Sequence, residues 1–206
     1  MNQYLIDTDY AVHQLVELIT AEEVQIAQIQ LACEAKKPKL EFLYRRFRDS
    51  EWNDDVDEIK LQSYFVNWAK EQQEITDLQE EIKRLELSID IKKDSINALC
   101  GALLQIAKQG ISKVHGNLTN CSDGRSVGSE KLKNVIWQGR NQSLHYEEGS
   151  FRRPIQDCFA NLAATFGNQF SLTLHPQENL AYDVIQILDW KNYSVYISDM
   201  QSLLPG

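Results

Sequence analysis

The chain has 206 residues and a net charge of −9, from 21 basic and 30 acidic side chains. This length suffices for a sizeable core, and the acidic balance argues against a broad, non-specific coat on nucleic acid. No apolar run approaches the roughly 18 residues that span a bilayer, and the N-terminus lacks a signal-peptide pattern. We expect a cytoplasmic protein with reduced thiols, because paired spacing is absent among its four cysteines, Cys33, Cys100, Cys121 and Cys158.

The N-terminal stretch carries an apolar heptad repeat. Its members in one register are Val12, Ile19, Ile26, Cys33, Leu40 and Phe47. A helix with this seam should kink near Lys37, because Pro38 cannot donate the helical hydrogen bond. The polar segment 48–55 then predicts a turn.

A second heptad repeat occupies the centre of the chain. One register contains Leu61, Trp68, Ile75, Ile82, Ile89, Ile96 and Leu103. This spacing over six heptads predicts a coiled-coil seam. The simplest interpretation of the two repeats is a long antiparallel helical hairpin over residues 1–115. The alternative is a coiled coil between two chains.

The heptads stop after Gly110, and the rest of the chain predicts shorter helices. The Gly-, Asn- and Ser-rich segment 115–128 predicts an exposed, mobile loop, and Ser129 is the expected cap of a helix leading through Trp137. Pro154 suits the first turn of the next helix, which should end at Gly167. Residues 170–175 are expected to be extended. Two further helices are expected over 178–190 and 193–204, so the predicted fold class is all-α.

One motif in the C-terminal half has the residues needed to cut RNA without a metal. It is Arg140-Asn141-Gln142-Ser143-Leu144-His145. A guanidinium such as that of Arg140 holds phosphate charge, and the histidine, which titrates near neutrality, accepts the 2′-hydroxyl proton. Asn141 would orient the histidine or a phosphate oxygen. Residues five apart on a helix lie about 140° apart, so two copies related by a two-fold axis form such a site more readily than one.

This motif resembles the hallmark of the HEPN superfamily, in which an Arg followed by a polar residue precedes a His by a short spacing. The resemblance implies an HEPN-like helical bundle over residues 116–206, to which the long hairpin is an extension, both folding as one cooperative unit. It implies a homodimeric, metal-independent endoribonuclease that needs no cofactor and leaves 2′,3′-cyclic phosphate ends. Such enzymes act on RNA as toxins or defence effectors, and an antitoxin or nucleotidyltransferase is the partner it implies.

Basic residues around the motif are candidates for RNA contacts. The segment 125–153 has six Lys and Arg against three Glu, a local charge of +3 that suits an RNA-binding groove. The candidate RNA-binding side chains are Lys131, Lys133, Arg152 and Arg153.

Tyr146 is a candidate modification site. In HEPN toxins paired with minimal nucleotidyltransferases, a tyrosine two positions after the histidine is adenylylated. Here the tyrosine follows His145 directly, and Glu147 holds the family's position. This departure puts that mode of control in doubt.

A non-catalytic reading of the same residues stays open. Arg140 and His145 could form surface ion pairs with Glu147 and Glu148, each worth under about 1 kcal/mol. The protein would then be a helical interaction or dimerisation module, an inactive HEPN domain or an adaptor. The other histidines, His13, His115 and His175, have no metal-ligand spacing and are expected to be ordinary surface or turn residues.

Overall fold

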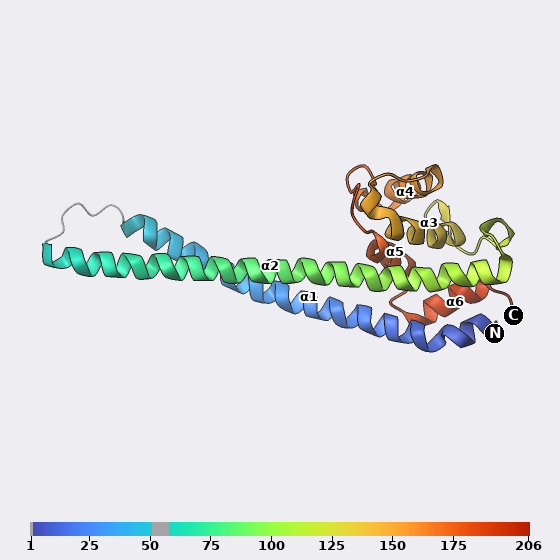
Figure 1. The fold of residues 1–206 in the computed structure, drawn as a ribbon, viewed down its shortest axis with the longest axis horizontal. Coiled ribbons are helices and arrows are strands. Elements are labelled where there is room, and N and C mark those ends of the chain that lie inside the picture. The colour runs from blue at the N-terminus through green and yellow to red at the C-terminus, as the bar shows by residue number, and fades with distance from the viewer. Residues whose placement is uncertain (1, 51–57) are drawn as a thin grey trace. The chain divides into compact units, whose positions relative to one another are not determined.

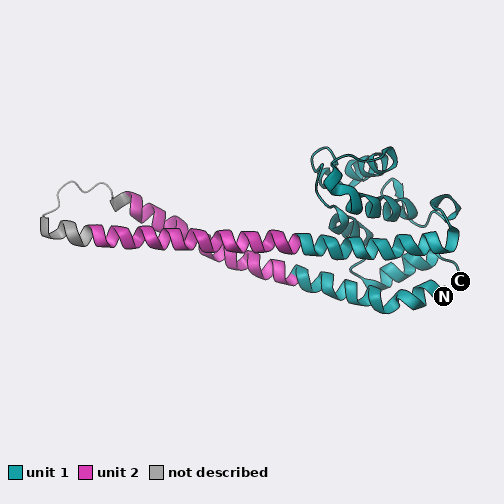
Figure 2. Cartoon of the chain, in the orientation of Figure 1, with its two compact units in different colours: residues 1–23, 94–206 teal, residues 24–93 magenta. Residues whose placement is uncertain are grey.

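The computed structural model describes residues 2–50 and 58–206, with side chains described outside 49–64. This part of the chain is almost wholly helical, which confirms the all-α class (Figure 1). Two long helices, α1 (Gln3–Ser50) and α2 (Glu58–His115), precede the shorter elements. The chain forms two compact units (Figure 2). Unit 1 contains the residues up to Glu23 and those from Asp94 to Gly206, and unit 2 contains Val24–Lys93.

Unit 2 is an antiparallel pair of helical segments. Its buried core is Cys33, Leu43, Ile75, Leu78 and Ile82, flanked by Leu40, Phe47 and Leu85. Ion pairs join the two segments at Lys36–Glu81 (2.8 Å), Lys39–Glu74 (2.8 Å) and Arg46–Glu71 (2.7 Å). Partner numbers on α2 fall as those on α1 rise, so the segments run in opposite directions. The heptad positions of this unit therefore meet within one chain.

α1 is a single helix from Gln3 to Ser50, with Pro38 inside it. Since proline has no N–H, the ladder lacks one hydrogen bond there, but the helix continues. The prediction of a turn over 48–55 was wrong for residues 48–50, because α1 extends to Ser50. Residues 51–55 of that segment lie outside the described residues.

Unit 1 has one hydrophobic core to which both long helices contribute. Leu5 and Ile19 of α1 and Leu103 of α2 are buried in it. The remaining contributors include four shorter helices, α3 (Leu132–His145), α4 (Arg153–Phe166), α5 (Ala181–Leu188) and α6 (Tyr193–Leu203). Residue 115, where the sequence suggested a division, lies inside this unit.

The segment before α3 is more structured than expected. It contains a 3₁₀ turn, η1 (Leu118–Asn120), and two short antiparallel strands, β1 (Ser126–Val127) and β2 (Glu130–Lys131). Its predicted full exposure was wrong, because Cys121 and Val127 are buried.

The prediction of Ser129 as a helix cap was also wrong. The helix begins after Lys131 without a side-chain cap, and Ser129 lies in the turn between the strands. The strand pairing explains this, since Gly128 has a left-handed φ of 60° and turns the chain there.

The later helices follow the predictions closely. α4 has Pro154 in its first turn and ends at Gly167, whose φ is 110°. α5 starts at Ala181, later than expected, because the Asn97 side chain accepts the backbone N–H of Tyr182 there. Residues 170–175 are not extended as predicted. Phe170 is the fully buried last residue of the 3₁₀ turn η3 (Asn168–Phe170), and residues 172–175 lie in turns.

Candidate functional site

The motif lies on the last two turns of α3, and the helix divides into two faces there. The buried face includes Leu132, Val135, Ile136, Gly139 and Gln142. The outer face, called here the α3 strip, consists of Trp137, Arg140, Asn141, Leu144 and His145. At 100° per residue, Arg140 and His145 form the two edges of this strip, about 140° apart, and the other three lie between them.

The Arg140 edge of the strip faces α2. Its Nε donates a hydrogen bond to Oε1 of Gln105, and its Nη1 donates to Oδ1 of Asn141 at 3.3 Å. Beside it, the Lys108 ammonium lies 4.5 Å from the ring centroid of Trp137, a cation–π contact. Burial, together with the positive charge of Arg140, lowers the pKa of Lys108. This edge therefore carries two neighbouring cations.

The His145 edge faces the link between α3 and α4. Nδ1 of His145 lies 2.6 Å from Oε1 of Glu148, on the 3₁₀ turn η2 (Tyr146–Glu148). With Glu148 ionised, the proton of the neutral imidazole belongs on Nδ1, which leaves Nε2 as the free acceptor. The chain reverses at Gly149, whose φ is 63°. The turn thus supplies the carboxylate that orients the histidine.

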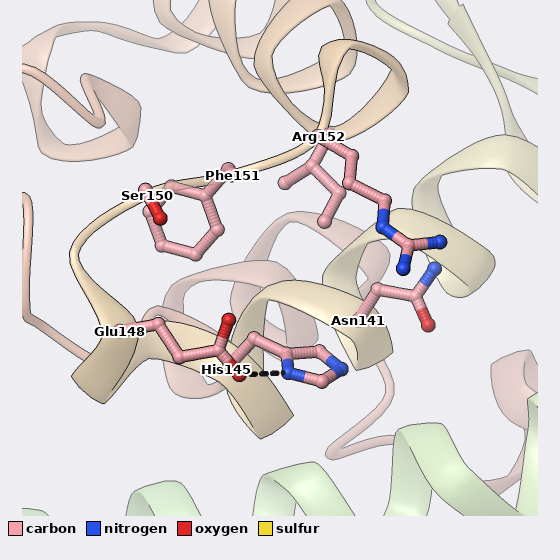
Figure 3. Close-up of a pocket in the computed structure, with 7 residues that line it drawn as sticks. Asn141, His145, Glu148, Ser150, Phe151 and Arg152 are labelled. Carbon is pink, nitrogen blue, oxygen red and sulfur yellow. Dashed lines mark hydrogen bonds and ion pairs between the residues drawn. The ribbon is translucent and has the colours of Figure 1, made fainter.

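A hollow of about 300 Å³ lies beside this turn (Figure 3). Its lining residues are Asn141, His145, Glu148, Ser150, Phe151, Arg152 and Ile155. In Figure 3 the Arg152 guanidinium extends toward the Asn141 amide, and the ring nitrogen of His145 that is not bound to Glu148 points to the same side. One chain therefore brings an imidazole, an amide and a guanidinium to one cavity.

Arg140 does not line this hollow. The structure brings together Asn141 and His145 of the predicted catalytic residues, and it holds Arg140 at the opposite edge of the strip. The cation that joins them within one chain is Arg152, predicted only as an RNA contact.

The other candidate RNA contacts are engaged to different degrees. Lys133 donates to the Cys121 carbonyl at 2.7 Å and pairs with Asp123 at 2.9 Å, and its side chain is only 17% exposed. Lys131 is exposed, and its Nζ donates a hydrogen bond to Oγ of Ser126 at 3.3 Å. Arg153, with a side chain 89% exposed, has a loose pair with Asp157 at 3.6 Å. Lys133 therefore holds the loop before α3, whereas Arg153 is open to solvent.

Tyr146 is partly buried, and its hydroxyl donates to Glu147 at 3.2 Å. Burial, followed by that hydrogen bond, raises the pKa of Tyr146.

The remaining histidines have partners within the fold. The His13 ring stacks on Tyr193 with centroids 3.5 Å apart, and Nε2 of His115 lies 2.7 Å from the Leu203 carbonyl oxygen. Nδ1 of His175 lies 3.0 Å from Glu178. Among residues 2–50 and 58–206, no three His, Cys, Asp or Glu side chains gather as a group able to hold a metal ion. No helix in these ranges is long and apolar enough to cross a membrane.

Two residues were named from the sequence without the place that they take in the site: Glu148 was expected only as a surface ion-pair partner, and Arg152 only as an RNA contact. Glu148 is three residues after His145, a spacing that places side chains together on a continuing helical turn, so its position was a usable signal. Arg152 reaches the hollow only because the chain reverses at Gly149. No local sequence pattern predicts the direction that the chain takes after this glycine.

Protein-family models, curated proteins and solved structures were compared with the chain, and none of them matches it.

Proposed function

We propose that this protein is a metal-independent endoribonuclease of the HEPN type, with a composite active site formed by two copies of the chain. The observation that supports this most is the α3 strip, with Arg140 and His145 at its two edges. The two side chains face different neighbours in one chain, Gln105 and Glu148. A two-fold axis along the strip places the Arg140 edge of one copy opposite the His145 edge of the other.

The centre of the strip is suited to self-association. Leu144 is 58% exposed, and Trp137, two turns earlier on the same face, is partly exposed. An apolar centre with polar edges is the usual arrangement of a protein interface. Pairing two strips buries Leu144 and leaves the polar edges around it.

The chemistry is transesterification within the RNA. Nε2 of His145 accepts the 2′-hydroxyl proton, the 2′-oxygen bonds to the neighbouring phosphorus, and the P–O5′ bond breaks. The products are a 2′,3′-cyclic phosphate and a 5′-hydroxyl, whose oxygen takes its proton from water. Arg140 stabilises the charge on the phosphorane oxygens. Asn141, in the same hollow as His145, orients a phosphate oxygen.

The direct test is incubation of the purified protein with RNA in EDTA. We expect cleavage that leaves 2′,3′-cyclic phosphate ends, and we expect His145→Ala to reduce the rate at least about a hundredfold, a typical general-base contribution. Arg140→Ala should do the same, and Arg140→Lys should restore little because the fork is lost. An inert but tightly dimeric protein would instead favour the interaction-module alternative, for which the His145–Glu148 and Arg140–Gln105 contacts are only surface pairs.

A mixing experiment tests the composite site itself. If Arg140→Ala and His145→Ala chains are mixed and exchanged, half of the dimers are mixed, and each has one site with both wild-type residues. We therefore expect recovery of about a quarter of wild-type activity from two inactive variants. No recovery, with exchange verified, would contradict a site shared between copies.

A further inference from the structure

We propose that the hollow beside α3 binds one nucleotide of single-stranded RNA and that Arg152 is the cation that holds its phosphate. This inference rests on the proposed function and adds the part of the substrate that one chain recognises alone. The hollow, of about 300 Å³, is at the lower end of the roughly 300–1,000 Å³ typical of small-ligand sites. Such a volume suits a single nucleotide and excludes a duplex.

Arg152 is available for an anion. Within residues 2–50 and 58–206 its guanidinium makes no hydrogen bond or ion pair. Arg140 binds Gln105, and Arg153 has Asp157 at 3.6 Å. A free guanidinium at the rim of a cavity suits the bidentate geometry of phosphate oxygens.

The other polar groups of the hollow complement a phosphate on its ribose. Nδ2 of Asn141 has only a long contact of 3.4 Å to Gln138, so it can donate to a phosphate oxygen. The one carboxylate in the lining, Glu148, lies 2.6 Å from His145, which offsets its repulsion of an anion. Nε2 of His145 points to the same side as the Arg152 guanidinium (Figure 3). A phosphate held by Arg152 and Asn141 therefore has the proposed base beside it.

The lining also offers a surface for the base. Phe151 is partly buried in the wall of the hollow, which Ile155 also lines. Single-stranded nucleic acids are held by this combination of cationic groups for phosphates and aromatic side chains for bases. A paired base in a helix cannot enter such a hollow, so single-stranded RNA is the substrate class.

The test uses a ligand that cannot be cut, so that binding is separated from catalysis. A fluorescent six-residue RNA with 2′-O-methyl groups throughout lacks the attacking hydroxyl, and its binding is followed by anisotropy at several salt concentrations. Arg152→Gln should weaken binding about tenfold and should reduce the dependence of log Kd on log salt by about 0.7, the value for one phosphate contact in a single strand. Arg84→Gln is the control, since it removes the same charge from an exposed side chain of α2 that does not line the hollow, and it should change neither quantity appreciably.

Equal effects of Arg152→Gln and Arg84→Gln would overturn the inference, because binding would then reflect general positive charge. Competition by inorganic phosphate as effective as that by the oligonucleotide at equal phosphate concentration would also overturn it. Arg152 is exposed and without partners, so its replacement should leave the unfolding midpoint unchanged. If the protein binds through Arg152 but never cuts RNA, the proposed enzyme fails and this site stands. If the protein cuts RNA while the two variants behave alike, the proposed enzyme stands and the Arg152 site fails.

Discussion

The backbone N–H of Leu180 donates a hydrogen bond to Oε1 of Gln142 at 3.0 Å. Nε2 of the Gln142 side chain in turn donates to the Glu178 carbonyl at 2.7 Å. Gln142 is fully buried at the centre of the Arg–His motif. Its two bonds attach the segment before α5 to α3, so one residue of the motif is structural. The polar face of the motif is thereby fixed, because α3 cannot rotate without breaking both bonds.

Gln142→Ala should destabilise the protein by about 2–4 kcal/mol. The change leaves the buried N–H of Leu180 without a partner, which costs about 1–3 kcal/mol, and it removes the donor to the Glu178 carbonyl, which adds less because Glu178 is exposed. Urea unfolding measures this loss. Gln109→Ala, a change at an exposed position on α2, is the matched control and should stay within about 0.5 kcal/mol. Equal midpoints for the two variants would show that the Gln142 amide adds nothing to stability.

A structural arginine, Arg125, lies before α3. Arg125 donates to both oxygens of buried Asp199, from Nε at 2.8 Å and Nη2 at 3.0 Å, and the Trp190 indole donates to the same carboxylate at 2.9 Å. Arg125→Ala should lower the free energy of unfolding by about 2 kcal/mol. Removing one partner of a fully buried ion pair costs about 3–5 kcal/mol, and the loss is smaller here because Arg125 is partly exposed. Arg125→Lys should recover only part of this, because it loses the fork. Thermal unfolding should rank the midpoints as wild type, then Arg125→Lys, then Arg125→Ala. Equal midpoints for Arg125→Lys and the wild type would contradict this prediction.

These two networks show what could and could not be inferred from the sequence. The heptad positions correctly gave the buried seam of unit 2, because apolar spacing of seven is a local pattern that Cys33 and Ile82 obey. The helix of the motif and the start of α4 at Pro154 also followed from local signals. Arg125 was counted toward an RNA-binding charge, yet its partner Asp199 is 74 positions away, and no local pattern pairs them.

The candidate site was predictable in the same uneven way. His145 and Asn141 share the hollow because they lie four residues apart on one helix face, which spacing alone indicates. Arg152 joins them through the reversal at Gly149, where the direction of the returning chain depends on how α4 packs against the core. Tertiary packing of this kind has no signature in the motif.

Glu148 should act as a positioning residue for His145. Nitrogen NMR of the neutral imidazole should show the Nδ1–H tautomer in the wild type and in Glu148→Gln, since both side chains accept from Nδ1. Glu148→Ala removes that acceptor and should raise the Nε2–H population, the form favoured in water. If the protein is the proposed nuclease, Glu148→Ala should lower kcat about tenfold with little change in KM, while Glu148→Gln keeps most of the rate. An unchanged tautomer in Glu148→Ala would refute the role.

The last prediction concerns unit 2. The core of unit 1 contains no residue from 24–93, and the buried core of unit 2 is separate from it. A variant in which a short flexible linker joins Glu23 to Asp94 should therefore keep the unit 1 core, including Ile19 and Leu103. Helical circular dichroism, cooperative melting and the oligomeric state by sedimentation report the result.

In this variant the α3 strip and the hollow are intact, so the proposed nuclease should still dimerise and cut a short RNA. The lost part is a long exposed pair of helices that carries charges of both signs, such as the Lys36–Glu81 and Arg46–Glu71 pairs. Surfaces of this kind suit recognition of a regulator rather than chemistry, so the variant should lose its response to that regulator. If the deletion instead abolishes dimerisation while unit 1 stays folded, the hairpin is the dimer interface. The proposed pairing of α3 strips would then be wrong. The interaction-module alternative would explain the apolar heptad core of unit 2 better.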